Sequence, residues 1–329
     1  MFSHLIPHYV PIPVLPILCV VASLFALNAA AQHEAPPIFQ REPRPMPSSL
    51  QIESELRLET YFSSLAQGGV GLLRLSGEGI QRARAELRGE STPFFQADDG
   101  AFYALIAADM DIIPRAYTLT VGAHSQTSAV TFARELRIDS ANFIVQDLQL
   151  PSGRAYLADA EIESAELALL ESMTSETTPA SLWDASGFEL PHDSELITPF
   201  GTYRRLGDDR QSRHTGWDQN VPIGSPIQSM AAGLVVFADA LAIRGDYVLI
   251  DHGLGIYSGY AHFSELHVEA GQSVAAGQII GLSGNSGRSS APHLHWEVAL
   301  RGKWVDGAAF LALWLPSPSG AATDADAPQ

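Results

Sequence analysis

The chain has 329 residues, 46% of them hydrophobic and 17% charged, with a formal net charge of −18. This length exceeds what one hydrophobic core usually holds, and the composition is that of a globular protein, so we expect two domains. Residues 32–195 carry 11 arginines and no lysine against 25 acidic residues. Because nucleic-acid binding needs a positive field, we expect no nucleic-acid partner.

The N-terminal segment has the features of an export signal. The first 31 residues contain no Asp, Glu, Lys or Arg, and an apolar run from Leu15 to Leu27 leads into Ala29-Ala30-Ala31. This pattern predicts a signal peptide at residues 1–31, with the mature protein in the periplasm, outside the cell or in the cell envelope. A positively charged start is missing, so an uncleaved N-terminal anchor is the alternative. No later stretch approaches the ~20 apolar residues of a membrane span, so we expect no stable span in the mature form.

The next segments favour a β-rich N-terminal half. Residues 32–49 are rich in proline and polar groups and are predicted to form a flexible leader. Residues 50–138 hold about seven short apolar runs separated by turn residues, the first at Leu50–Leu58. This spacing predicts an antiparallel β-sandwich of immunoglobulin-like type. The sequence leaves open whether such a domain targets the protein, spaces it or covers its active site.

The remaining chain is predicted to be a helix-containing linker followed by a second β-domain. Residues 139–181 form the linker, in which Asp159–Met173 has an apolar stripe at helical spacing. Residues 182–312 alternate glycine, β-branched and apolar residues without a long helical period, which predicts a compact antiparallel β-sheet domain. The fold class is therefore mainly all-β. Residues 313–329 are small, polar and proline-containing, and are predicted to be a disordered tail.

Two histidines in the second β-domain indicate a metal site. His293 and His295 are two residues apart in an apolar run, so in a strand both side chains emerge from one face. Upstream, His214 and Asp218 offer an imidazole and a carboxylate, both zinc ligands, if the chain bends between them, which Gly216 would allow. With His295 these make three ligands, the number that a catalytic zinc site uses when it keeps one position open.

The order of motifs between about Pro199 and Asp306 resembles the lysostaphin-type (LytM-type) zinc metalloendopeptidases, a family of peptidoglycan hydrolases that includes members with an N-terminal β-domain. The motifs that carry this resemblance are His214-x-x-x-Asp218, Tyr260-Ala261-His262 and Pro292-His293-Leu294-His295-Trp296-Glu297-Val298. Three positions depart from the usual family pattern: Ala291 for glycine, Trp296 for phenylalanine and Gly307 for proline. None of them removes a ligand or an ionisable group, so we expect an effect on substrate fit.

The resemblance implies a zinc-dependent endopeptidase that hydrolyses the peptide cross-links of peptidoglycan. His214, Asp218 and His295 would hold one Zn²⁺ per chain, and His262 and His293 would flank the open position. We expect His293 to be the base that activates water and His262 to bind the oxyanion, although the two roles could be interchanged. The partners would be peptidoglycan peptide stems. The sequence does not specify the oligomeric state.

Further expectations concern a non-catalytic alternative function and two residues near the predicted site. Some members of this family have lost zinc ligands and act as non-catalytic cell-wall-binding modules that activate another hydrolase. Here all five positions are filled, which favours the enzyme. Glu297 has the same strand parity as His295 and is a candidate to orient a ligand imidazole, whereas His252, at a turn, is expected to be structural.

Overall fold

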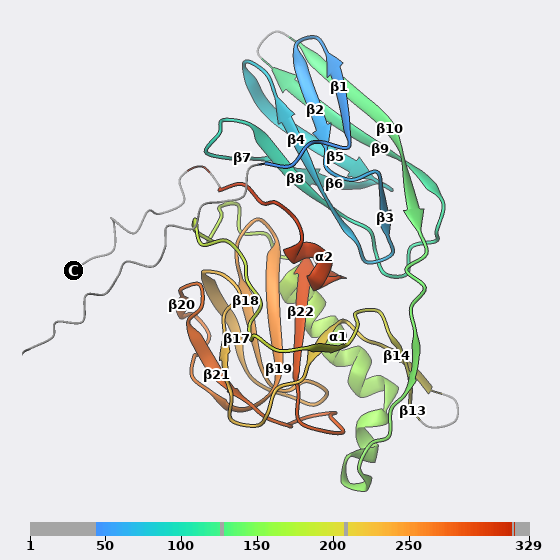
Figure 1. Ribbon diagram of the computed structural model, residues 1–329, viewed down its shortest axis with the longest axis vertical. Helices are drawn as coiled ribbons and strands as arrows, with labels where there is room; N and C mark the ends of the chain where they lie inside the picture. The colour runs from blue at the N-terminus through green and yellow to red at the C-terminus, as the bar shows by residue number, and fades with distance from the viewer. Residues whose placement is uncertain (1–43, 126–127, 207–209, 318, 320–329) are drawn as a thin grey trace, which may run out of the picture. The chain divides into compact units, whose positions relative to one another are not determined.

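The computed structural model describes residues 44–125, 128–206, 210–317 and 319 (Figure 1). The predicted signal peptide, the alternative anchor and the leader up to residue 43 lie outside these ranges, as does the predicted tail from residue 320 onward. None of the helices in the described ranges has the length and apolar character needed to cross a membrane.

The strands between Ser49 and Asp139 form two five-stranded sheets. The first consists, in spatial order, of β1 (Ser49–Glu53), β2 (Leu56–Thr60), β4 (Val70–Ser76), β8 (Phe102–Ala107) and β7 (Phe95–Gln96). The second consists of β3 (Ser64–Ala66), β10 (Ala129–Asp139), β9 (Ala116–Ser125), β5 (Ile80–Leu87) and β6 (Glu90–Pro93). Neighbouring strands are antiparallel except β3 and β10, which are parallel. Alternate residues of β5, β9 and β10 are buried, as expected for strands with one face on a core.

The sequence prediction of one strand over Leu50–Leu58 is wrong, because this segment is a hairpin of β1 and β2. The turn is made by Ser54 and Glu55, whose φ angles of 46° and 71° lie in the left-handed region. Two-residue hairpin turns usually take glycine or asparagine at such positions. The turn therefore carried no sequence signal.

A helical segment follows the two sheets. It begins with a 3₁₀ helix, η1 (Ser152–Ala158), and continues as α1 (Ala160–Thr174). The Asp159 carboxylate accepts a hydrogen bond from the Glu161 backbone N–H and caps the helix, and two acidic residues in the first turn complement its dipole. The predicted helix at Asp159–Met173 is confirmed to within one residue at each end.

The C-terminal part contains one small and one large sheet. In the small sheet β11 (Val145–Asp147) pairs in parallel with β13 (Tyr203–Leu206), which forms a hairpin with β14 (Arg210–Arg213). The large sheet has ten antiparallel strands. They are β12 (Leu196–Thr198), β15 (Gly216–Gln219), β16 (Pro226–Gln228), β17 (Gly233–Leu241), β18 (Gly245–Asp251), β19 (Ile256–Leu266), β20 (Ser273–Val274), β21 (Ile279–Ser283), β22 (Leu294–Leu300) and β23 (Lys303–Val305). A short helix, α2 (Gly307–Leu311), follows.

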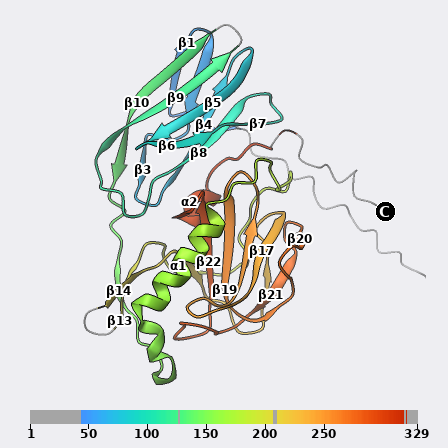
Figure 2. The same cartoon turned by 180° about the vertical axis from the view of Figure 1, so that it is seen from behind.

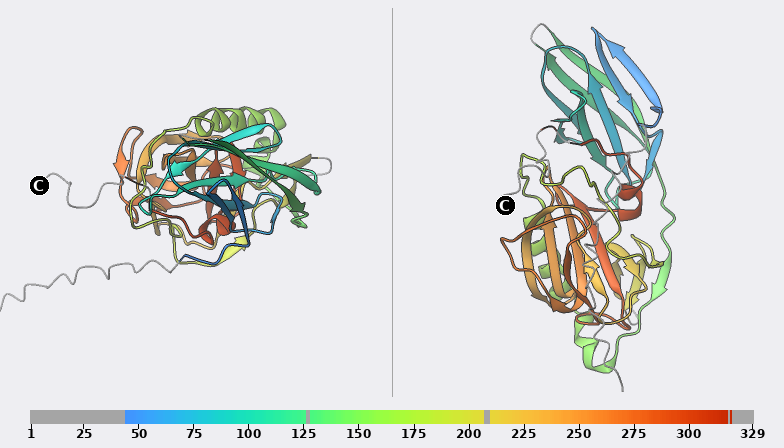
Figure 3. Two further views of the ribbon diagram at one scale, coloured as in Figure 1. Left: turned by 90° about the horizontal axis from the view of Figure 1, so that it is seen from above. Right: turned by 60° about the vertical axis from the view of Figure 1, so that its left-hand side comes forward.

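Helix α1 covers one face of the large sheet (Figure 2 and Figure 3). Its Leu170 is fully buried in a cluster with side chains of β18, β19 and β22, among them Ala299. On the other face of β22, Trp296 packs in the same cluster as Phe310 of α2. Because strand residues alternate between faces, His295 lies on the face that α1 covers.

The chain stays packed beyond residue 312, where the sequence predicted a disordered tail. Leu315 is only 8% exposed and belongs to the same apolar cluster as Trp296. The described residues up to Ser317 are therefore part of the folded structure, and the prediction placed the start of the tail too early.

Candidate metal centre

Strand register brings three of the predicted site residues together. Asp218 of β15 is the cross-strand partner of His295 on β22, and His214 lies just before β15. His214 Nε2, His295 Nδ1 and Asp218 Oδ1 lie 2.8 to 3.0 Å from one another. All three residues are buried and could hold a metal ion together.

The other two predicted site residues border this cluster. The His262 ring centroid lies 4.7 Å from that of His293 and 6.0 Å from that of His295. His262 has a φ of 67°, which is uncommon for a residue other than glycine, and it lies where the register of β18 and β19 shifts. A bulge at this point re-aims the side chain toward the histidine cluster. His293 Nε2 lies 3.4 Å from Asp218 Oδ1.

Each of the four histidines has one ring nitrogen in contact with an oxygen acceptor outside the His-Asp-His cluster. In three of them Nδ1 lies 2.7 to 2.9 Å from a backbone carbonyl oxygen, the pairs being His214 with Pro199, His262 with Ser286 and His293 with Ala291. His295 instead places Nε2 2.9 Å from Glu297 Oε1. If the contacted nitrogen donates, the other nitrogen keeps its lone pair. On His214 and His295 that other nitrogen is the one that contacts Asp218 Oδ1.

Burial keeps two of these imidazoles neutral near pH 7. It lowers the pKa of His214 from 6.5 to about 4, and the nearby Arg204 guanidinium acts in the same direction. Burial also holds the pKa of His262 well below 6.5, assisted by the neighbouring His293 and His295. Neutral imidazole is the form that binds a metal or accepts a proton.

Neighbouring charged groups shift the pKa values of Asp218 and His295. Burial alone would raise the pKa of Asp218, but Arg204 and His214 outweigh it and hold that pKa well below 3.8. For His295, burial would lower the pKa, but contacts with Glu297 and Asp218 outweigh it and raise the pKa. The pKa of His214 is lowered and that of His295 is raised. The difference arises because only His295 has a carboxylate, that of Glu297, on the ring nitrogen that faces away from Asp218.

Arg204 was not singled out from the sequence. It lies on β13, and its guanidinium donates a hydrogen bond to Asp218 Oδ2, leaving Oδ1 directed at the histidines. No motif surrounds Arg204, and only the tertiary pairing of β13 with β14 brings it to the site.

The role predicted for Gly216 is also different from the one observed. His214 and Thr215 form the two-residue connection between β14 and β15, and Gly216 is already the first residue of β15. A Cβ atom at Gly216 would lie 2.1 Å from the Trp296 backbone oxygen. The glycine is required by the close approach of β22 and not by a bend.

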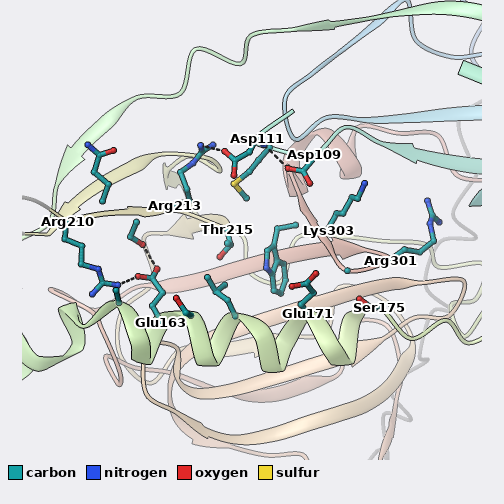
Figure 4. A pocket seen from close by; sticks show the side chains of 18 of the residues that line it. Asp109, Asp111, Glu163, Glu171, Ser175, Arg210, Arg213, Thr215, Arg301 and Lys303 are labelled. Carbon is teal, nitrogen blue, oxygen red and sulfur yellow. Dashed lines mark hydrogen bonds and ion pairs between the residues drawn. The ribbon is translucent and has the colours of Figure 1, made fainter. Parts of the chain in front are cut away.

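The metal centre lies in confined space. A cavity of about 30 Å³ is lined by His214, His262 and His295, and a neighbouring one of about 150 Å³ is lined by His293 and Asp218. A larger cavity of about 1080 Å³ borders α1, β14 and β23 and is lined by none of the four histidines. Figure 4 shows this larger cavity. We place the candidate site at the small cavities, because the ionisable groups converge there.

The residues present fit a divalent metal such as zinc. Two imidazole nitrogens and one carboxylate oxygen are a donor set found at catalytic zinc sites. His293 Nε2 is buried without a hydrogen-bond partner, and its lone pair faces Asp218 Oδ1. Two acceptors in this arrangement are satisfied by a cation or a water molecule between them.

His252 has the structural role expected of it. Its Nδ1 lies 2.8 Å from the Ala232 carbonyl oxygen and its Nε2 2.7 Å from Ser258 Oγ. It is fully buried, and burial lowers its pKa from 6.5 to about 4. His252 therefore connects β18 to β19 and to the segment before β17.

The fold and the site together define a β-sheet domain with a buried His-Asp-His cluster suited to a metal ion. Residues 212–307 match the model of peptidase family M23. A protein from Pseudomonas aeruginosa named for peptidase M23 has a crystal structure with a TM-score of 0.57 and 26% identity, covering 75% of this chain and 94% of that one. The chain therefore contains a peptidase family M23 domain, and the predicted family resemblance is confirmed.

Two curated relatives are similar over this domain. Peptidoglycan DD-endopeptidase ShyA of Vibrio cholerae is 43% identical over 97 residues, which are 30% of this chain and 23% of that protein. DD-carboxypeptidase/endopeptidase Mpg of Neisseria meningitidis is 35% identical over 125 residues, which are 38% of this chain and 28% of that protein. The chain thus spans about a quarter of the length of these relatives.

Proposed function

We propose that the chain is a zinc-dependent endopeptidase that hydrolyses peptide cross-links of peptidoglycan. The observation that carries this proposal is the convergence of imidazole lone pairs and the Asp218 carboxylate at one buried site. The name of ShyA supports peptidoglycan as the substrate and a DD-type cross-link as the bond. A substrate of this kind also supports the proposal that the protein is exported to the cell envelope.

In this proposal one Zn²⁺ is held by His214 Nε2, Asp218 Oδ1 and His295 Nδ1. Zinc bound there supplies a Lewis acid that polarises the scissile carbonyl and lowers the pKa of water. The contacts of His214 with the Pro199 carbonyl and of His295 with Glu297 hold the two rings in the orientation that ligation needs.

His293 is the proposed general base. Its Nε2 lone pair lies 3.4 Å from the ligand atom Asp218 Oδ1 and has no competing hydrogen bond. Its Nδ1 donates to the Ala291 carbonyl oxygen, which keeps the ring in this orientation. His293 would accept the proton of the attacking water and return it to the leaving amine.

For His262 we propose a role different from the oxyanion donor expected from the sequence. Its Nδ1 hydrogen is committed to the Ser286 carbonyl oxygen, and burial disfavours a second proton on the ring. His262 Nε2 therefore accepts a hydrogen bond, from water or from a substrate N–H. A non-catalytic activator role is disfavoured, because all five site positions are filled.

The proposal is tested with zinc-loaded protein on defined cross-linked muropeptides, with the products identified by mass spectrometry. We expect cleavage of the cross-link by the wild type and loss of cleavage after zinc is removed with a chelator. His295→Ala should lose zinc itself, whereas His293→Ala should keep zinc and lose most turnover. Zinc-loaded wild type that releases no peptide would refute the proposed activity, and a normal zinc content in His295→Ala would refute the ligand assignment.

A further inference from the structure

The Glu297 carboxylate accepts hydrogen bonds from several side chains at both of its oxygen atoms. Its Oε1 accepts from His295 Nε2 at 2.9 Å, from Arg244 Nη2 at 2.5 Å and from the Thr215 hydroxyl. Its Oε2 accepts from Arg244 Nε and from the Tyr247 hydroxyl, both at 2.9 Å. Glu297 is fully buried. A carboxylate with this many donors has one fixed orientation.

The two strands beside β22 leave room for this network. The cross-strand partners of Glu297 are Gly216 on β15 and Gly259 on β19. A Cβ atom at Gly259 would lie 2.0 Å from the Tyr247 hydroxyl oxygen and 3.1 Å from Glu297 Oε2. A Cβ atom at Gly216 would lie 2.9 Å from Glu297 Cγ. Glycine at these two positions thus leaves the space that the Glu297 side chain and its partners occupy.

Arg244 connects this network to helix α1. Its Nε and Nη2 form a two-pronged contact with Glu297, and its Nη1 lies 3.0 Å from Glu166 Oε1. The Glu166 carboxylate also accepts from the backbone N–H groups of Ile243 at 2.7 Å and Arg244 at 3.1 Å. Glu166 and Arg244 are each 5% exposed. A buried charge that loses a partner is costly, so each member depends on the others.

We propose that Glu166 of helix α1 is a positioning residue for the zinc ligand His295, acting through Arg244 and Glu297. The inference rests on the zinc site of the proposed function. It goes beyond the family match, because Glu166 lies outside residues 212–307.

The physical reason is that a ligand imidazole needs a fixed hydrogen-bond partner on its far nitrogen. Glu297 provides that partner for His295, and the planar fork of Arg244 holds the Glu297 carboxylate in place. Glu166 satisfies the remaining Arg244 nitrogen and the backbone that carries it. Without Glu166 the guanidinium has an unpaired buried N–H and loses one of its two anchors. The position of Glu297, and with it the lone pair of His295, is then less well defined.

If Glu166 only attached α1 to the sheet, loss of another attachment of α1 would affect zinc binding equally. A second glutamate on α1 provides this control. Glu163 lies three residues earlier and pairs with Arg288 through two contacts of 2.9 Å and with Ser212 at 2.5 Å. It is also partly buried but has no contact with Arg244 or Glu297. Glu163 lines the small cavity beside His214 and His295 but makes no hydrogen bond to them, so Glu163→Gln perturbs the attachment of α1 and leaves the hydrogen bonds between Arg244, Glu297 and His295 in place.

The experiment compares the full-length wild type with Glu166→Gln and Glu163→Gln. Zinc affinity is measured by competition with a chromogenic chelator, and the visible spectrum of the Co²⁺-loaded protein reports ligand geometry. Outer hydrogen-bond partners of ligands typically contribute 10- to 100-fold in metal affinity, so we expect Glu166→Gln to weaken zinc binding about 10-fold and to change the Co²⁺ spectrum. Glu163→Gln should keep wild-type affinity and spectrum. Equal effects of both variants, or wild-type affinity in Glu166→Gln, would overturn the proposal.

A double-variant comparison tests the route from Glu166 to His295. If the effect passes through Glu297, the affinity loss in Glu166→Gln/Glu297→Gln equals that in Glu297→Gln alone. A loss of affinity in the double variant equal to the product of the two single-variant losses would contradict this route. If Glu166→Gln does not fold, Arg244→Lys serves instead, since it keeps a cation but loses the fork, and it should weaken zinc binding to a similar extent. Wild-type affinity in Arg244→Lys would likewise overturn the proposal.

The outcome for the wild type separates this inference from the proposed function. Wild-type protein that binds no zinc would refute the zinc peptidase itself. Wild-type protein that binds zinc, with affinity unchanged by Glu166→Gln, would refute only the positioning role of Glu166.

Discussion

Acidification provides a quantitative test of the packing around His252. This residue is fully buried, and burial lowers its pKa from 6.5 to about 4. Between these two values the unfolded chain binds a proton that the folded chain does not, so the free energy of unfolding falls as the pH falls. At 1.36 kcal/mol for each pH unit, the full loss is about 3 kcal/mol below pH 4, and about 2 kcal/mol is already lost between pH 8 and pH 5.

The assay is chemical denaturation of the zinc-free protein at pH 8 and pH 5, for the wild type and for His252→Gln. The zinc-free form is used because metal binding would add its own pH dependence. His214 also has a pKa lowered to about 4, but it contributes equally to both proteins and cancels in the comparison. The variant should be less stable than the wild type at pH 8 and should lose about 2 kcal/mol less between pH 8 and pH 5. The same loss in both proteins would refute the reasoning.

Three further predictions concern packing. Gly259→Ala places a Cβ 2.0 Å from the Tyr247 hydroxyl and should lower the free energy of unfolding, measured with denaturant, by about 1–3 kcal/mol. The control Gly122→Ala, whose Cβ has nothing within 4 Å, should leave the free energy of unfolding nearly unchanged. Equal losses in the two variants would contradict the close approach at Gly259. Leu170→Ala should cost about 2–5 kcal/mol, because Leu170 is fully buried, and the neighbouring Leu169→Ala, 40% exposed, much less. A chain shortened to residues 182–329 lacks α1 and should show a lower melting temperature than one starting at residue 140; identical melting would argue against α1 as part of the sheet's core.

The candidate site could be predicted from the sequence because each of its members lies in a short motif. His295 lies on β22 and His293 directly before it, in an isolated bridge with Gly284, whereas His214 lies in the two-residue connection before β15, the strand that carries Asp218. The register of β15 and β22, which pairs Asp218 with His295, could not be predicted from the motifs.

Glu297 was a candidate partner of His295 because of its strand parity, but Glu166 and Arg244 could not be predicted in this way. Glu166 lies on α1 and Arg244 in the connection between β17 and β18, 78 positions further along the chain. A buried Arg–Glu contact leaves no periodic pattern, since it depends on which strands become neighbours. Arg204 was missed for the same reason. Among the strands, the Ser54-Glu55 turn was missed because its residues are not those that usually adopt positive φ.

The glycines beside Glu297 have a consequence for how such a sequence can change over time. Gly216 and Gly259 lie on different strands, and Gly216 is restricted first by the Trp296 backbone, whereas Gly259 is restricted by the Tyr247 and Glu297 side chains. A substitution at Gly259 would be tolerated only after Tyr247 or Glu297 had become smaller, whereas a Cβ atom at Gly216 would still meet the Trp296 backbone oxygen. Positions 247, 259 and 297 are therefore expected to change together in homologous sequences, while position 216 stays glycine.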